Sequence, residues 1–228
     1  MSLCSDSEEA PVRGKPIIIA DDHPLFRGAL RQAIAGAAPD RDILEAPSLA
    51  DARAAIDDAK PGLLCLDLHM MDSEGFAGLI ALRQDHPALP VIVVSGSEAD
   101  NVARRALAFG AMAFVPKSSD IDVIRAAIAA VLDGETWAPP GAEDAAPSAE
   151  ADEVKKLSDL TPAQLKVLLL VHKGLLNKQI AYELDISEAT VKAHMTAIMR
   201  KLDVQTRTQA AMIAGALLVE TDVTKDDG

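Results

Sequence analysis

The stretch Leu63-Leu64-Cys65-Leu66-Asp67 is a short apolar run that ends in a carboxylate. Its length and composition are typical of a strand that is buried on both faces of a parallel sheet. Three other apolar runs also lead directly into polar side chains. Because ligands of open α/β sheets bind at the carboxyl ends of the strands, we expect these side chains to share one edge. The other runs are Ile17-Ile18-Ile19-Ala20 before Asp21 and Asp22, Val91-Ile92-Val93-Val94 before Ser95, and Ala113-Phe114-Val115-Pro116 before Lys117.

The acids of this set predict a site for a divalent cation. Mg²⁺ prefers oxygen ligands in octahedral geometry and keeps several of its waters. Asp22 and Asp67 are the best candidates for direct ligands, and Asp21 is expected to act through water. The main-chain carbonyl of His69 is also within reach. A single Asp after a strand is often only a turn or a helix cap, but this arrangement involves four strands at once.

The remaining side chains predict phosphoryl chemistry at the same edge. A phosphoryl group on Asp67 would accept a hydrogen bond from the Ser95 hydroxyl, and the Lys117 ammonium would neutralise part of its charge. The histidines do not suggest a separate metal site, because the spacings of His23, His69, His86 and His172 match no common ligand pattern.

Strands and helices alternate over the first 133 residues. This alternation predicts an α/β domain, a doubly wound (βα)5 parallel sheet covered by helices on both faces. Ser48 and Asp120 are expected to cap helices, and Gly110 and Gly134 to end them. The expected strands are 16–20, 42–46, 63–67, 90–95 and 113–116, and the expected helices are 24–37, 48–58, 74–86, 100–109 and 120–132.

From Leu157 onward the pattern is helical only, so an all-α domain is expected. Thr161-Pro162-Ala163-Gln164 combines an N-cap, a proline at the first helical position and a capping-box glutamine. Asp185-Ile186-Ser187 is expected to form a tight turn between a short helix over 177–184 and a longer helix that ends near Leu202. Two helices joined by a three-residue turn form a helix-turn-helix.

Charge also separates the two parts. The chain has 228 residues and a net charge of −13, which would argue against a nucleic-acid partner if the charge were uniform. Residues 157–218 carry seven Lys and Arg against five Asp and Glu, so this part is mildly basic. An Ala-, Pro- and acid-rich stretch precedes it and is typical of a linker. We therefore expect domains at 15–133 and 157–219 joined by a flexible linker over 134–156.

We expect no signal peptide, because the N-terminal residues are acidic and show no basic-then-apolar pattern, and no apolar segment has membrane-spanning length. Its two cysteines do not make a disulfide framework, and Cys65 is expected to be a small buried hydrophobe. We expect a soluble cytoplasmic protein with no membrane partner.

The carboxylates Asp21, Asp22 and Asp67, with Ser95 and Lys117, match in order and position the receiver domain of two-component response regulators. The resemblance covers about residues 15–133. It implies that Asp67 accepts a phosphoryl group from a sensor histidine kinase with Mg²⁺ present. Together with Ser95 and Lys117, it would catalyse only its own phosphorylation and dephosphorylation, as a switch rather than a metabolic enzyme. Ser95 and Phe114 would be the switch pair. Met71 stands where many receivers have proline, which puts the rigidity of that loop in question.

The second domain resembles the LuxR/NarL-type helix-turn-helix. The matching motifs are Leu160 to Gln164, Gly174 to Ala181, Ile186 to His194, and Lys201-Leu202-Asp203-Val204. The resemblance implies binding to double-stranded DNA, with residues 188–202 as the recognition helix. The expected DNA contacts are Lys178, Thr190, Lys192, Ala193, His194, Thr196, Arg200, Arg207 and Thr208.

Together the two resemblances indicate a NarL/FixJ-type response regulator in which phosphorylation of Asp67 controls DNA binding and transcription. They imply that the unphosphorylated receiver covers or misorients the recognition helix, and that phosphorylation favours homodimers on paired half-sites. Two alternatives remain open. Asp67-Leu68-His69 superficially resembles the nucleophile motif of haloacid dehalogenase-type phosphatases, which have an acid where this chain has His69 and would not be expected to carry a helix-turn-helix. The chain could also be a binding module, such as a phosphate sink or an unphosphorylated regulator.

Overall fold

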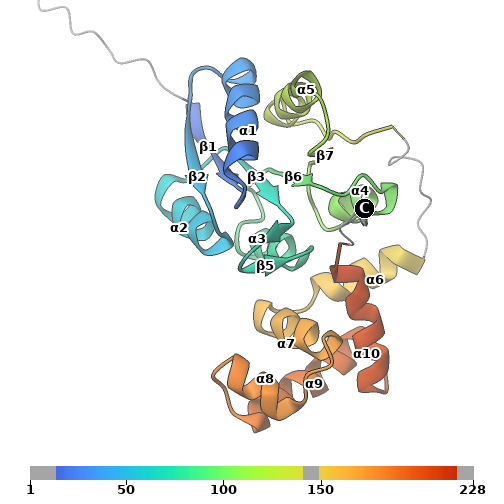
Figure 1. The fold of residues 1–228 in the computed structure, drawn as a ribbon. Coiled ribbons are helices and arrows are strands. Elements are labelled where there is room, and N and C mark those ends of the chain that lie inside the picture. The colour runs from blue at the N-terminus through green and yellow to red at the C-terminus, as the bar shows by residue number, and fades with distance from the viewer. Residues whose placement is uncertain (1–13, 141–148, 220–228) are drawn as a thin grey trace, which may run out of the picture.

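A computed structural model of the chain describes residues 14–140 and 149–219. These residues form an α/β domain followed by an all-helical domain (Figure 1). In the α/β domain, five parallel strands form one sheet in the order β2-β1-β3-β6-β7, which confirms the predicted fold class. The strands are β1 (Gly14–Ala20), β2 (Arg41–Ala46), β3 (Leu63–Asp67), β6 (Val91–Ser95) and β7 (Ala113–Pro116).

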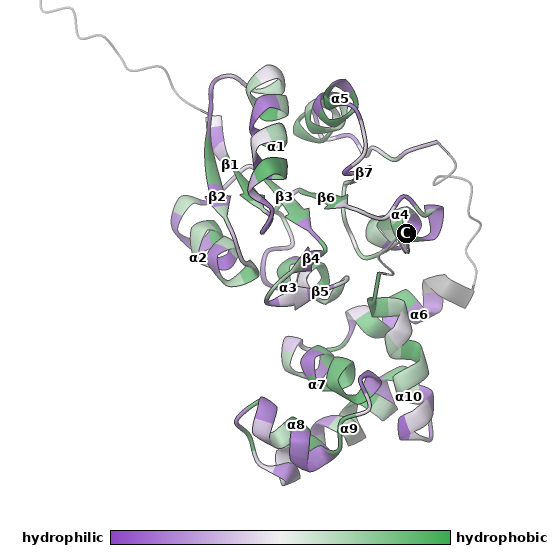
Figure 2. Ribbon diagram, viewed as in Figure 1, coloured by the Kyte–Doolittle hydropathy of each residue, from purple (hydrophilic) through white to green (hydrophobic). Residues whose placement is uncertain are grey.

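Helices cover both faces of this sheet, and for this reason the central strands are apolar throughout. In β1, Ile17 and Ile19 point to one face, where they join the side chains of α1 and α5, and Ile18 points to the opposite face. Hydropathy colouring shows the central strands as hydrophobic (Figure 2). The helices of this domain are α1 (Pro24–Ala37), α2 (Leu49–Ala59), α3 (Ala77–Asp85), α4 (Asp100–Ala108) and α5 (Ile121–Leu132).

A short antiparallel hairpin follows β3 and was not predicted. It consists of β4 (His69–Met70) and β5 (Ser73–Glu74), and it delays the start of α3, which was expected at residue 74. Both carboxylate oxygens of Asp72 accept hydrogen bonds of 2.9 Å from the first main-chain amides of α2. This contact fixes the loop that Met71 had put in question, although Met71 itself is almost fully exposed.

The predicted helix caps are largely present. Ser48 accepts a hydrogen bond from Asp51 N, and Thr161 forms the complete capping box with Gln164. Asp120 is the N-cap residue of α5, as predicted, although its side chain makes no capping hydrogen bond. The helices of the second domain are α6 (Ala149–Ser158), α7 (Pro162–His172), α8 (Asn177–Glu183), α9 (Glu188–Leu202), α10 (Arg207–Ala214) and the 3₁₀ turn η1 (Gly215–Leu217).

Helix α6 differs from the flexible linker that was expected over 134–156. Its residues Val154 and Leu157 are buried against the second domain, so the end of the stretch belongs to that core. The three-residue spacing of these two side chains is the helical signal, and the surrounding Ala and acidic residues obscure it. At the other end of the stretch, Trp137 forms a parallel bridge to Ala113. Residues 141–148 lie outside the described residues.

None of the helices in the described ranges combines the length and apolarity that a membrane-spanning segment requires.

Candidate functional site

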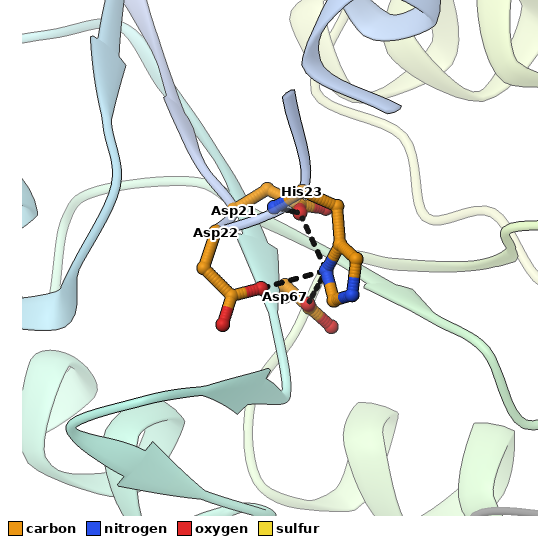
Figure 3. Close-up of side chains that lie close together, drawn as sticks. All are labelled: Asp21, Asp22, His23 and Asp67. Atoms are coloured by element: carbon orange, nitrogen blue, oxygen red, sulfur yellow. Dashed lines mark hydrogen bonds and ion pairs between the residues drawn. The ribbon is translucent and has the colours of Figure 1, made fainter. Parts of the chain in front are cut away.

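Four side chains meet at the carboxyl end of the sheet (Figure 3). Asp21, Asp22, His23 and Asp67 each offer a ligand atom, and these atoms all lie within 4.8 Å of one another. Asp21 is 1% and Asp67 is 3% exposed, so both carboxylates are removed from bulk water. The cluster combines the three acids that the sequence predicted with a histidine that it did not.

The sheet register explains why the acids meet. Strands β1 and β3 are parallel neighbours, and Ala20 pairs with Leu66. The next residue on each strand is therefore an acid, and Asp21 lies beside Asp67. Asp22 and His23 follow in the turn that leads into α1, where His23 N donates a 2.7 Å hydrogen bond to Asp21 Oδ1.

Lys117 follows β7 and connects two of the acids. Its Nζ lies 2.7 Å from Asp21 Oδ2 and 2.9 Å from Asp67 Oδ2. The ammonium also lies 4.9 Å from the centroid of the Phe26 ring, a cation–π distance. The predicted amine is thus in contact with the predicted phosphoacceptor.

Burial raises the pKa of the Asp67 carboxyl above its usual value, because the charged form loses water. Lys117 opposes this shift through its hydrogen bond and its charge, and His69 N opposes it with a hydrogen bond of 3.1 Å to Asp67 Oδ1. The neighbouring charge of Asp21 raises the pKa further. Asp67 is therefore a poorly solvated carboxylate next to a fixed cation.

The acidic cluster fits a hard divalent cation. Among the residues that the structure describes, the buried atoms Asp21 Oδ2 and Asp22 Oδ1 find no hydrogen-bond partner, and each has an ion-pair neighbour. The neighbour is Lys117 for Asp21 and the His23 ring, at 2.6 Å, for Asp22. Carboxylate oxygens that lie close together and have spare lone pairs are the donors that such a cation prefers.

His23 is the member of the cluster that sequence reasoning missed. Its Nδ1 lies 3.4 Å from Asp21 Oδ1 and 3.9 Å from Asp67 Oδ2, although the ring is 65% exposed. The spacing of the histidines matched no metal site made of several histidines. His23 instead lies in a cluster with three acids. Its position in the sequence, directly after Asp21-Asp22, could have indicated that it lies in the cluster.

Two arginines that the sequence did not single out support the turn. Arg27 donates from Nη1 to Asp21 O at 2.8 Å and from Nε to Glu45 Oε2 at 2.9 Å. Arg31 also bonds Glu45, and together the hydrogen bonds of Arg31 and Arg27 lower the pKa of that carboxyl. This network fixes the main chain that carries the acidic pair.

The predicted switch pair is buried near the cluster. Ser95 is completely buried, and its Oγ accepts a hydrogen bond of 3.2 Å from Ser97 N. Phe114 is also completely buried. The site opens to solvent through a cavity of about 490 Å³, which His23, Leu25, Phe26, Asp67, His69, Gly96 and Lys117 line.

The second candidate surface lies on α9. Val191, Met195, Ile198 and Leu202 form its buried stripe. The predicted DNA contacts lie mostly on other faces: Thr190, Lys192, Ala193, Thr196 and Arg200 are exposed, as are Lys178 and Thr208, while His194 is half-buried.

Arg207 is placed differently from the other expected contacts. Its guanidinium donates to Asn177 Oδ1 at 2.8 Å and to Leu175 O at 2.5 Å, so it is engaged within the domain. These bonds tie the start of α10 to the start of α8. Thr196 Oγ1 also makes an internal bond, to Lys192 O.

The receiver does not cover the recognition helix in this structure. Helices α8 and α9 lie at the end of the second domain that faces away from the sheet, whereas α6 and α7 lie toward it (Figure 1). The exposed side chains of α9 are therefore accessible, so of the two expected arrangements, a covered or a misoriented recognition helix, the covered one is not present.

Comparison with known families places both domains. Residues 17–129 match the response regulator receiver domain, and residues 158–214 match the bacterial regulatory proteins of the luxR family. Over 212 residues the chain is 41% identical to the glycerol metabolism activator of Pseudomonas putida, with 87% of this chain and 94% of that protein covered. This chain is a response regulator. Its LuxR-type domain is a DNA-binding domain, and the family match excludes the phosphatase alternative.

The response regulator has other relatives of the same organisation. It is 34% identical to the nitrate/nitrite response regulator protein NarP of Escherichia coli, with 86% of this chain and 93% of that protein covered. Its fold is similar to that of RcsB from Salmonella enterica serovar Typhimurium bound to promoter rprA in the presence of phosphomimetic BeF3⁻. That likeness has a TM-score of 0.53 and 21% identity, and covers 89% of this chain and 99% of the other. A structure of two RcsB dimers bound to two parallel DNAs is similar too, with a TM-score of 0.54, 21% identity, and 90% and 99% of the two chains covered.

Proposed function

We propose that this response regulator is switched by phosphorylation of Asp67 and that the switch controls its binding to DNA. The observation that carries the proposal is the Asp67 carboxylate at the end of β3, held beside Lys117 and opening on the cavity. A carboxylate oxygen of Asp67 attacks the phosphorus of a phosphohistidine, the P–N bond breaks, and the imidazole leaves. Lys117 lies where it neutralises charge on the phosphoryl oxygens.

We further propose that Mg²⁺ is the cation of the site. Asp22 and Asp67 would bind it directly, Asp21 through water, and His69 through its main-chain carbonyl. When bound, the ion supplies charge neutralisation for the incoming phosphoryl group. The support is the cluster of carboxylate oxygens, two of which have no hydrogen-bond partner in the described part of the chain.

Ser95 and Phe114 are proposed to link the phosphoryl group to the rest of the receiver. Ser95 Oγ now accepts from Ser97 N, so a turn of this hydroxyl toward a phosphoryl oxygen would break that bond. Phe114, which is completely buried on the neighbouring strand β7, is the side chain proposed to move into the space that the hydroxyl leaves.

The partners follow from the two domains. A sensor histidine kinase is the proposed phosphodonor, and double-stranded DNA is the output ligand. Because DNA is the target, we place the protein in the cytoplasm. RcsB, of similar fold, was crystallised as dimers on DNA. We propose that this protein likewise binds paired half-sites as a homodimer when phosphorylated. The proposed DNA contacts are Lys178, Thr190, Lys192, Ala193, His194, Thr196, Arg200, Arg207 and Thr208.

Selection of DNA sites from a random pool tests this function directly. With Mg²⁺ and beryllofluoride, which mimics the phosphoryl group, we expect enrichment of sites built from two similar half-sites. Without beryllofluoride we expect weaker enrichment. Equal enrichment in both conditions would contradict the proposed switch and favour a regulator that works unphosphorylated.

The metal is expected to depend on Asp22 more than on Asp21. Asp21 already has Lys117 at 2.7 Å on one oxygen and His23 N at 2.7 Å on the other. Within residues 14–140 and 149–219, the polar neighbour of the Asp22 carboxylate is the His23 ring. We therefore expect Asp22→Ala to weaken Mg²⁺ binding by the larger factor, as measured by titration calorimetry. Asp58→Ala, an exposed acid on α2, is the control. A larger loss in Asp21→Ala would reverse the assignment.

A further inference from the structure

His23 brings a nitrogen donor into a group of carboxylates. Its ring nitrogen Nδ1 lies 2.6 Å from Asp22 Oδ1, 3.4 Å from Asp21 Oδ1 and 3.9 Å from Asp67 Oδ2 (Figure 3). In an octahedral complex with bonds of about 2.1 Å, neighbouring donors lie about 3 Å apart and opposite donors about 4.2 Å apart. The spacing of these atoms therefore suits a single ion that is bound by nitrogen and oxygen together.

The main chain directs this ring toward the acids. His23 is the N-cap residue of α1, but its side chain makes no capping hydrogen bond. Serine, threonine, aspartate or asparagine is preferred at such a position, where the side chain bonds the first amides of the helix. The main chain of His23 is held on both sides, because its N donates to Asp21 Oδ1 at 2.7 Å and its O accepts from Phe26 N at 3.1 Å. The ring is thus anchored at its base and is not used by the helix.

The ring also borders the cavity of the site. His23 and Asp67 both line this cavity of about 490 Å³, so an ion that enters it meets the imidazole and the carboxylate at the same place. The His23 side chain is 65% exposed. It can therefore adjust to an ion by a small rotation without displacing core side chains.

Two oxygens of the cluster are left for a further partner. Asp21 is 1% exposed, and in the part of the chain that the structure describes its Oδ2 atom has no hydrogen-bond partner, like Asp22 Oδ1. Lys117 neutralises part of the charge, since its Nζ lies 2.7 Å from Asp21 Oδ2 and 2.9 Å from Asp67 Oδ2. Asp22 instead faces the His23 ring. A buried carboxylate oxygen without a hydrogen bond is unfavourable, and an ion shared by Asp22 and His23 would satisfy it.

Nitrogen and oxygen donors select different ions. Mg²⁺ takes oxygen ligands and keeps several waters, so it would bind the carboxylates and leave the imidazole unused. Imidazole is a good ligand for first-row transition ions, and the affinity of a mixed nitrogen and oxygen site rises from Mn²⁺ through Co²⁺ to Ni²⁺. One imidazole among carboxylates therefore favours this second class of ion.

We propose that His23 is a metal ligand through Nδ1 and that, with Asp22 and Asp67, it lets the receiver bind a first-row transition ion more tightly than Mg²⁺. The proposal rests on the metal site proposed above and adds a second class of ion to it. The two classes use the same carboxylates, so a bound transition ion excludes Mg²⁺. The occupant of the site then depends on the relative concentrations of the two classes of ion.

Titration calorimetry of the full chain with Co²⁺ and with Mg²⁺ tests the proposal. His23→Ala should lower the affinity for Co²⁺ by roughly tenfold or more and that for Mg²⁺ by less than about threefold. His86→Ala is the matched control and should change neither affinity, because that ring lies 3.8 Å from an acid, Asp57, but outside the cluster.

The sign of the change separates the possible outcomes. An unchanged ratio of the two affinities in His23→Ala would overturn the proposal. Tighter binding of both ions by the variant would also overturn it, because the ring would then compete with the ion for Asp22. Binding of neither ion by the wild type would refute the proposed metal site itself.

Bound Mn²⁺ reports the nitrogen ligand directly. Electron spin echo envelope modulation of the wild type with Mn²⁺ should show a coordinated nitrogen, and its frequencies should shift when histidine is labelled with ¹⁵N. The modulation should be lost in His23→Ala and kept in His86→Ala. Bound Mn²⁺ without nitrogen modulation in the wild type would overturn the role of His23 and leave the carboxylate site intact.

Discussion

Asp67→Asn is expected to take up no phosphoryl group, because the amide keeps the shape of the side chain but loses the nucleophilic oxygen and its charge. After incubation with acetyl phosphate and Mg²⁺, mass spectrometry should show one labile phosphate on the wild type and none on the variant. Asp58→Asn, an exposed acid on α2, should be labelled like the wild type. Undiminished labelling of Asp67→Asn would place the phosphoacceptor elsewhere.

The same substitution should raise the melting temperature at neutral pH. Burial raises the pKa of Asp67, so the folded protein binds its proton more tightly than the unfolded chain does. Ionisation of Asp67 therefore does not lower the free energy of unfolding at a pH below the pKa of Asp67 in the unfolded chain. It lowers this free energy as the pH rises through the pKa of Asp67 in the folded protein. The melting temperature of Asp67→Asn should exceed that of the wild type by a small amount in acid and by a larger amount at neutral pH. Loss of one partner for Lys117 works against it, but Asp21 remains in contact with that ammonium.

Lys192→Ala should give the second large effect, a loss of operator affinity of roughly 1–3 kcal/mol if the side chain reads a base. Ser187 caps α9, so Lys192 lies within the first two turns, the part of a recognition helix that enters the major groove. A contact to phosphate would instead weaken binding to all sequences and lower the salt slope by about one unit. Gel shifts on operator and scrambled DNA at two salt concentrations distinguish the two.

The comparison for Lys192 needs a lysine whose loss changes only net charge. Lys155 on α6 is exposed and lies outside the recognition helix, so Lys155→Ala should leave operator affinity nearly unchanged. Lys173 is a poorer control, since it pairs with Glu74 of the receiver. Equal small losses for Lys192→Ala and Lys155→Ala would mean that the recognition surface lies elsewhere.

The sequence predicted the sheet and the principal site because both depend on local signals. The run that ends at Asp67 has a strand-like composition, and parallel strands bring their carboxyl ends together whatever the details of packing. Ser95 and Lys117 therefore reached the expected edge with no knowledge of tertiary contacts. The capping box at Thr161 fixed the start of α7 for the same local reason.

What the sequence did not predict depends on contacts between distant segments. Each strand of the β4–β5 hairpin has only two residues, which is too short for an alternation of polar and apolar side chains to be recognised. The hairpin is held in place by Asp72, which accepts a hydrogen bond from the first turn of α2. Arg207 looked like a free cation, but Leu175 and Asn177 lie within reach of it only in the folded domain. The hydrogen bond from Phe76 N to Leu217 O joins residues far apart in the chain, and no pattern in either segment indicates it.

The placement of Lys117 has a kinetic consequence. Asp21, Asp67 and the Phe26 ring already hold its ammonium where negative charge will accumulate. The Lys117 ammonium then needs little reorganisation when the phosphoryl group is transferred, so its placement adds little to the activation free energy. The encounter with the phosphodonor, rather than rearrangement of the lysine, would therefore set the pace at which this switch responds.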